Sequence, residues 1–131
     1  MKYIIKPEDE KTPGKTVADA MYPGTHSGLV SSWIGIGPRD ILSKYKLGNL
    51  LSDRIQISVN TYAPGGYSVK HAHPERDQAY YIVNGKALVE VADERGEAIK
   101  GAMVLIPSKT SHAFSNAGKE PLTLLVISSY L

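Results

Sequence analysis

The sequence predicts an all-β domain, built as an antiparallel sandwich or barrel. Residues 54–62 alternate apolar and polar side chains, which is the pattern of a half-buried strand. Other short runs rich in β-branched or aromatic residues recur along the chain, separated by turns that contain Gly, Pro, Asn or Asp. No long run has the period of a helix. Short strands at this spacing are typical of all-β sandwiches and barrels.

The strands are expected at residues 3–5, 28–37, 54–62, 79–83, 86–91, 103–106 and 122–129. The third of them should stop at the turn formed by residues 63–66. Residues 7–15 are charged and carry Pro and Gly, so we expect a loop there, within an N-terminal arm of about residues 1–27. Residues 40–48 are expected to form a loop, with one helical turn marked in part by the pair Leu50 and Leu51.

Length and composition limit the class of protein. A chain of 131 residues is expected to form one domain, residues 1–131. Without cysteine it has neither disulfides nor thiolate ligands, so a metal would be held by nitrogen and oxygen. The net charge of +2 comes from dispersed charges, which argues against nucleic acid as a partner. No apolar stretch is long enough for a signal peptide or a membrane span, so we expect a soluble, cytoplasmic protein.

Two segments hold three of the four histidines, namely His71, His73 and His112. Side chains of a strand alternate between its faces, so His71 and His73 point the same way, about 6.5–7 Å apart along the strand. Two imidazoles at that spacing can converge on one ion. A third histidine in a second segment, near the turn residue Pro107, strengthens the prediction of a metal site.

The first segment resembles the first motif of the cupin family. It follows the family pattern at Gly65, His71, His73 and Gly85. The departure is Gln78, because the family usually has glutamate at this position.

The second segment resembles the second cupin motif. It follows that pattern at Gly101, Pro107, His112 and Asn116. Here the departure is Lys109, which replaces the usual second glycine.

The resemblance implies the fold and the site. The fold would be a double-stranded β-helix, the jelly-roll barrel of the cupins. The site would hold a divalent transition metal (Fe, Mn, Ni, Cu or Zn), and the sequence does not choose among these ions. The implied ligands are His71, His73, Gln78 and His112.

Gln78 changes the chemistry that we expect of this site. Three neutral histidines and a carboxylate leave a formal charge near +1 at a divalent ion, whereas an amide leaves +2 and favours anionic ligands. An amide also cannot serve as a general base. Glu75 or Asp77 could replace Gln78 as a ligand if the strand carried a bulge.

Strand alternation also predicts the walls of a pocket. If the histidines face a barrel interior, the same face carries Gln78, Tyr80, Ile82, Phe114 and Asn116. The polar face of the strand at 54–62 could line a wet cavity too, but we favour a solvent-facing position for it, since half-solvated antiparallel strands are common. That face consists of Gln56, Ser58, Asn60 and Tyr62, with Ile55, Ile57 and Val59 then in the core.

Three residues outside the two motifs also bear on a pocket. Trp33 and Tyr67 could stack on a substrate, but we expect both to pack in the core. His26 lies in a predicted loop and is expected to be a surface residue, not a fourth ligand.

The function that we predict is that of a small metal-dependent enzyme, similar to the dioxygenases of the cupin family. Its substrate would be an anionic or enolisable oxygen-containing small molecule, with Tyr80 or Tyr62 transferring a proton or orienting the substrate. The alternatives are a lyase or isomerase of the same fold, a non-catalytic sugar- or small-molecule-binding protein, and a metal-free epimerase-like cupin. A homodimer is expected, because an N-terminal strand could add to a neighbour's sheet edge.

Overall fold

The structure is a computed structural model that describes residues 3–10, 12–21, 24–37 and 50–131. Its elements, in chain order, are η1 (Pro7–Asp9), α1 (Gly14–Met21), β1 (His26–Gly37), β2 (Leu50–Leu51), β3 (Ile55–Ser68), β4 (Arg76–Asn84), β5 (Lys86–Val91), β6 (Glu94–Ile99), β7 (Met103–Ile106), β8 (His112–Asn116) and β9 (Leu122–Tyr130). Neither described helix has the length and apolarity needed to cross a bilayer.

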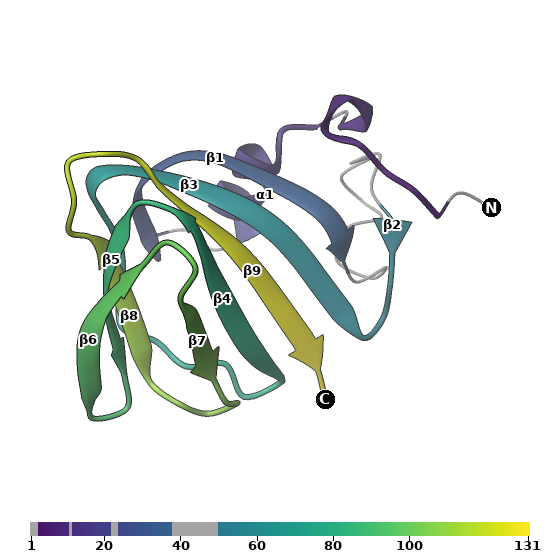
Figure 1. Cartoon of the computed structure of the whole chain (residues 1–131). Helices are drawn as coiled ribbons and strands as arrows, with labels where there is room; N and C mark the ends of the chain where they lie inside the picture. Colours follow the sequence, from purple (N-terminus) through teal and green to yellow (C-terminus); the bar gives the residue numbers. More distant parts are fainter. Residues whose placement is uncertain (1–2, 11, 22–23, 38–49) are drawn as a thin grey trace.

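The strands form one strongly curved sheet that nearly closes into a barrel (Figure 1). Their order is β6-β5-β8-β3-β9-β4-β7, and β1 adds to β3 while β2 adds to β1. Strands distant in sequence therefore lie side by side, as in a jelly roll. The predicted all-β jelly-roll fold is confirmed.

The core lies inside this curved sheet and follows the two-residue period of the strands. In β4 the side chains of Arg76, Gln78, Tyr80 and Ile82 are buried, and the residues between them are half-buried or exposed. The same period places Leu122 and Leu124 of β9 in the core. The buried apolar cluster comprises Leu29, Tyr62, Tyr80, Ile82, Ala87, Val89, Ala98, Ile106, Phe114, Leu122 and Leu124.

The strands predicted at 86–91 and 103–106 are confirmed with the same bounds, and those predicted at 28–37, 79–83 and 122–129 are confirmed with small changes at their ends. The predicted stop at residues 63–66 is wrong, because β3 continues through this turn sequence to Ser68. Gly66 makes the continuation possible: a Cβ there would lie 2.9 Å from the carbonyl oxygen of Ser27, so only glycine lets β1 and β3 approach this closely. β6 was not predicted, since its residues lack apolar alternation.

The N-terminal region differs from the prediction. Residues 3–5 are not a strand, and Tyr3 is 77% exposed. The expected loop at 7–15 contains η1 and the start of α1, which packs on β1 with Val17 fully buried (Figure 1). An eight-residue helix is too short to show a helical period.

The remaining prediction, at residues 40–48, lies outside the described residues. Leu50 and Leu51, which were thought to mark a helical turn there, instead form β2 and pair in parallel with β1.

Lys109 adopts a left-handed backbone conformation, with φ 65°, at the position where the cupin pattern has glycine. Its N–H donates a hydrogen bond to the carbonyl oxygen of His73 (2.8 Å), so the strained turn is tied to the histidine segment. Glycine adopts this conformation without a Cβ clash, whereas a β-branched residue is strained there.

We therefore predict that Lys109→Gly keeps or raises the free energy of unfolding, by up to about 1 kcal/mol, and that Lys109→Val lowers it by about 1–2 kcal/mol. Urea titration measures both. Lys100→Gly is the matched control: Lys100 lacks a positive φ, so glycine there should only lower stability. A Lys109→Gly protein less stable than Lys100→Gly would contradict the prediction.

Candidate metal centre

A β-bridge outside the main strands joins the two histidine segments. The N–H of His71 donates to the carbonyl oxygen of His112 (3.0 Å), and the N–H of His112 donates to that of His71 (2.9 Å). Residues 41 positions apart are thereby directly opposite each other. Their side chains lie on the same face of the sheet, because directly opposed residues of an antiparallel pair do so.

His73 completes a cluster of three imidazoles. The ring centroids are 4.7 Å apart for His71 and His73, 4.4 Å for His71 and His112, and 5.2 Å for His73 and His112. One ligand atom from each ring lies within 4.8 Å of the other two. In the described part of the chain, this is the one group of three or more His, Asp or Glu side chains placed closely enough to hold an ion. The triad is compatible with a divalent metal.

Backbone carbonyls set the proton positions on two of the rings. Nδ1 of His71 is 2.6 Å from the carbonyl oxygen of Val69, and Nδ1 of His112 is 2.9 Å from that of Thr110. A carbonyl oxygen only accepts, so each Nδ1 donates and each Nε2 carries a free lone pair. Nε2 of His112 is buried and has no hydrogen-bond partner within the described structure. A buried lone pair without a partner is what a metal ligand provides before it binds its ion.

His73 and His112 are held in the neutral form that binds metals. Burial is the largest cause that lowers the pKa of His73, and together with the nearby guanidinium of Arg76 and the other histidines it brings this pKa to about 3. Burial also lowers the pKa of His112, although its hydrogen bond to Thr110 acts in the opposite direction. At neutral pH these rings offer lone pairs instead of positive charge.

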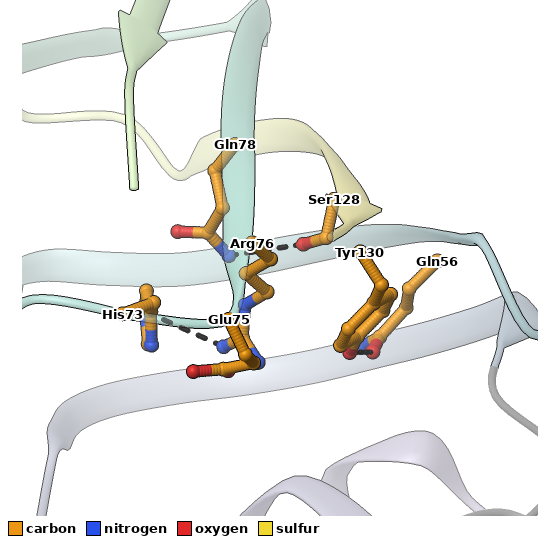
Figure 2. A network of polar contacts seen from close by, with 7 residues as sticks. All are labelled: Gln56, His73, Glu75, Arg76, Gln78, Ser128 and Tyr130. Atoms are coloured by element: carbon orange, nitrogen blue, oxygen red, sulfur yellow. Dashed lines mark hydrogen bonds and ion pairs between the residues drawn. The ribbon is translucent and has the colours of Figure 1, made fainter. Parts of the chain in front are cut away.

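Gln78 faces the same cavity from β4. Its side-chain N–H donates to the hydroxyl of Ser128 (3.1 Å), which leaves Oε1 buried and without a hydrogen-bond partner among the described residues (Figure 2). The Ser128 contact therefore orients the amide so that its oxygen, the atom able to coordinate a cation, stays available.

Asp77 and Glu75, the carboxylates that could replace Gln78 as a ligand, lie away from the cavity. Asp77 is exposed, and its Oδ1 accepts a hydrogen bond from the N–H of Ser108 (2.7 Å). Glu75 is exposed and pairs with Arg76 at 2.8 Å. β4 keeps an unbroken register with β9 from Arg76 to Ile82, so the bulge that this alternative needs is absent there.

The cavity beside the triad has a volume of about 200 Å³. Pockets for drug-sized ligands have volumes of roughly 300–1,000 Å³, so this one suits a molecule of few heavy atoms. It is lined by Ala18, Thr25, His26, Ser32, Ile34, Gln56, Ser58, Asn60, Tyr62, His71, His73, Arg76, Gln78, Tyr80, Phe114, Leu124, Val126 and Ser128.

The polar face of β3 belongs to this cavity, so the solvent-facing position that we favoured for it is wrong. All four of its residues line the cavity: Gln56, Ser58, Asn60 and Tyr62. Ile55, expected in the core, is exposed, and Ile57 and Val59 are half-buried. At this end of the barrel the polar residues of β3 therefore face inward and its apolar residues face outward.

The predicted pocket wall is right at three of five positions. Gln78, Tyr80 and Phe114 line the cavity, whereas Ile82 lies in the apolar core. Asn116 is structural, because its side-chain N–H groups donate to the carbonyl oxygens of Tyr62 (3.1 Å) and Glu120 (2.9 Å).

Both candidate tyrosines reach the cavity, and their rings flank one phenylalanine. Tyr62 and Tyr80 each contact Phe114 edge-on, with centroids 4.9 and 5.7 Å away. Burial raises the pKa of both phenols above its usual value. Both hydroxyls are therefore protonated at neutral pH.

The prediction that His26 lies at the surface in a loop is wrong. It begins β1, lines the cavity, and its Nδ1 lies 2.9 Å from the hydroxyl oxygen of Tyr62. Tyr67 is not in the core, because it is 45% exposed. Trp33 is half-buried and does not belong to the buried core cluster. Its sequence neighbours Ser32 and Ile34 line the cavity, so strand alternation places Trp33 on the opposite face of β1.

Sequence reasoning missed Arg76, which places a buried cation beside the triad. Its side chain is 7% exposed, and its Nη2 is 3.4 Å from Nε2 of His73 (Figure 2). The guanidinium also lies 5.7 Å from the ring centroid of Tyr130, which Gln56 holds by a 2.9 Å hydrogen bond. A signal was present: Arg76 is two residues before Gln78, so strand alternation gives it the same face.

The fold and the histidine triad define a cupin, and the sequence agrees. The sequence model of the Cupin domain family matches residues 58–128, which is more than half of the chain. The chain belongs to this family.

Two relatives and one solved structure show how far the likeness extends. Germin-like protein subfamily 2 member 3 of Arabidopsis thaliana is 30% identical over 126 residues, which cover 92% of this chain and 53% of that protein. Uncharacterized protein MJ1618 of Methanocaldococcus jannaschii is 36% identical over 64 residues, covering 49% of this chain and 51% of the relative. The chain thus spans about half the length of both. The structure of KdgF from Halomonas sp. matches with a TM-score of 0.61 and 18% identity over 79% of this chain and 81% of that one, which supports the fold.

The low pKa of His73 predicts that acid destabilises the metal-free protein. The unfolded chain binds a proton on this histidine near pH 6.5, whereas the folded protein does so only near pH 3. Between these values the unfolded state binds more protons, so the free energy of unfolding should fall as the pH is lowered from 7 to 4. Urea titrations with a chelator present measure it. His73→Gln should flatten this dependence, and an equally steep dependence in that variant would contradict the assignment.

Proposed function

We propose that this chain is a metal-dependent enzyme acting on a small anionic molecule that chelates the metal through adjacent oxygens. The observation that carries the proposal is the convergence of three imidazoles beside a buried guanidinium in one small cavity. Neutral donors bind the metal, and the cation selects the charge of the ligand.

The proposed ligands are the three histidines and Oε1 of Gln78. Two of these atoms, Nε2 of His112 and Oε1 of Gln78, are buried polar atoms without partners in the described structure. Leaving such atoms unpaired costs about 1–3 kcal/mol each, so a bound cation would relieve a real penalty. When bound, the metal would supply Lewis-acid polarisation of a substrate oxygen or, if redox-active, a centre for dioxygen.

Charge argues for an anionic substrate. A divalent ion with four uncharged ligands keeps its formal charge of +2, and the guanidinium of Arg76 adds a further positive charge next to His73. Glu75 pairs with that guanidinium but is itself exposed, so solvent screens its charge more than that of the buried Arg76. A carboxylate that contacts both the metal and Arg76 would relieve their mutual repulsion.

One observation bears on the class of reaction that the site would catalyse. A tyrosine hydroxyl hydrogen-bonded to an imidazole inside the cavity equips the site for proton transfer, which favours a lyase or isomerase. The dioxygenase stays a prediction, to be tested by oxygen consumption with an iron- or manganese-loaded protein. A non-catalytic binding protein would bind the same anions without turnover.

Homodimerisation and a cytoplasmic location also stay predictions. The route that we expected for dimerisation, addition of an N-terminal strand, is not supported, because residues 3–5 are not a strand. Light scattering with size-exclusion chromatography tests the oligomeric state directly.

Metal content tests the core of the proposal. Protein purified without chelators should carry close to one transition-metal ion per chain by elemental analysis. His71→Ala should lose it. Gln78→Ala should retain it with affinity reduced on the order of tenfold, because an uncharged oxygen is the weakest of the four donors. If the unaltered chain neither carries nor takes up a metal, the proposal fails.

The substitution Gln78→Glu tests the role of charge in the metal site. The carboxylate lowers the formal charge of the site from +2 to +1, so metal affinity should rise and the affinity of the metal-loaded protein for oxalate should fall, each on the order of tenfold. Oxalate is the simplest dianion with adjacent oxygens. Calorimetric titration measures both constants, and oxalate affinity that rises in this variant would contradict the argument.

Arg76→Gln should weaken oxalate binding to the metal-loaded protein by about 10–100-fold, the loss expected for a charge-assisted hydrogen bond in a buried site. Arg95→Gln is the matched control, because Arg95 is exposed on β6. Equal oxalate affinities in the two variants would show that Arg76 does not contact the anion.

A further inference from the structure

We propose that Tyr62 and His26 form a proton-transfer pair in which Tyr62 takes a proton from a carbon of the substrate and His26 takes the phenolic proton of Tyr62. The proposal rests on the proposed function and names its reaction class, enolisation of a 2-oxo acid. Tyr62 would be the catalytic residue, and His26 would act through it.

The geometry of the pair is set by two strands. The hydroxyl oxygen of Tyr62, on β3, is 2.9 Å from Nδ1 of His26, on β1, and the ring centroids are 5.8 Å apart with the planes inclined at 34°. β1 and β3 pair along most of their length, with His26 opposite Ser68 and Leu29 opposite Tyr62. Both side chains line the cavity, so the pair faces the bound molecule.

The pair lies next to the histidine triad. The ring of Tyr62 packs edge-on against Phe114, and Phe114 is two residues beyond His112 on the same face of β8. A substrate that chelates at the triad therefore has Tyr62 within the same small cavity. Tyr80 also lines the cavity, but among the described contacts a hydrogen bond to an imidazole is found for Tyr62 alone of the two.

The environment keeps both partners neutral at rest. Burial lowers the pKa of His26, with a further lowering by His71 that Asp19 partly offsets. Burial raises the pKa of Tyr62, and Tyr80 adds to the rise. At rest, the phenol of Tyr62 then donates its hydrogen bond to the imidazole of His26. The two residues must be in this state before they can act together as a general base and accept a proton.

The step balances without a further reactant. The C–H bond next to the substrate carbonyl breaks, and its proton forms a new O–H bond at Tyr62 while the original phenolic proton moves to Nδ1 of His26. The electron pair of the C–H bond stays on the substrate as its enolate, and His26 becomes an imidazolium. The reverse movement returns the proton held by the Tyr62 oxygen to the same or another carbon, and in D₂O it delivers deuterium once this hydroxyl proton has exchanged with solvent while the enolate is bound.

Hydrogen exchange into pyruvate tests the step. Pyruvate carries a carboxylate, adjacent oxygens and acidic methyl hydrogens, and NMR in D₂O follows the loss of its methyl protons. The metal-loaded protein should catalyse this exchange. Tyr62→Phe and His26→Asn should slow it at least about 100-fold, within the range for general acid–base catalysis. Tyr67→Phe, a change of an exposed tyrosine on the same strand, should exchange at the unaltered rate.

His26→Asn separates proton transfer from support of the fold. Asparagine keeps an acceptor for the Tyr62 hydroxyl but has no basic nitrogen, so melting temperature and oxalate affinity should stay unchanged while exchange is lost. A second measurement does not depend on turnover: ¹⁵N NMR of the metal-free protein should show Nδ1 of His26 unprotonated and hydrogen-bonded, with a changed shift in Tyr62→Phe.

The outcomes distinguish the two proposals. A protein that binds metal and oxalate but does not exchange pyruvate protons overturns the pair and leaves the proposed function standing. Pyruvate proton exchange that persists in Tyr62→Phe or His26→Asn also overturns the pair and leaves the proposed function standing. A protonated Nδ1 of His26 has the same consequence. A protein that binds neither metal nor oxalate overturns the proposed function, and the pair with it.

Discussion

Two backbone hydrogen bonds, exchanged between His71 and His112, hold the site together. They bring the segment after β3 against the start of β8 and fix both side chains on one face. Strand alternation then adds His73, and the carbonyl oxygens of Val69 and Thr110 fix the ring tautomers. Each of these constraints is local, yet together they bring one ligand atom from each of three imidazoles within 4.8 Å of the others.

Charge gives the site its individual character within the cupin fold. A carboxylate at position 78 would neutralise part of the charge of a bound ion, but glutamine does not, and Ser128 orients its amide with the oxygen free. Arg76 adds a buried positive charge at His73. An anion that contacts both a bound ion and Arg76 would favour the binding of that ion, so ion and anion binding should be coupled. The small volume of the cavity limits how large that anion can be.

The sequence predicted what depends on spacing along one strand and missed what depends on contacts between strands. The shared face of His71 and His73 and most strands follow from local period and turn residues, whereas the place of His112 beside them was predicted from the resemblance to the second cupin motif. Extending the alternation back from Gln78 would also have found Arg76. The meeting of His26 and Tyr62 depends on the register of β1 and β3, which no local pattern encodes. The inward polar face of β3 depends on the barrel having a cavity at this end. α1 is too short for a helical period, and its place is set by close packing of Gly14 on the backbone of Ser32.

Electron paramagnetic resonance of the copper(II)-loaded protein is the most direct measurement of the central claim. The three-histidine site should bind one copper ion per chain and show hyperfine coupling to three imidazole nitrogens, and His112→Ala should reduce the coupled imidazoles to two. A signal with fewer than three imidazoles in the unaltered chain, or one that His112→Ala leaves unchanged, would place the ion elsewhere and contradict the account.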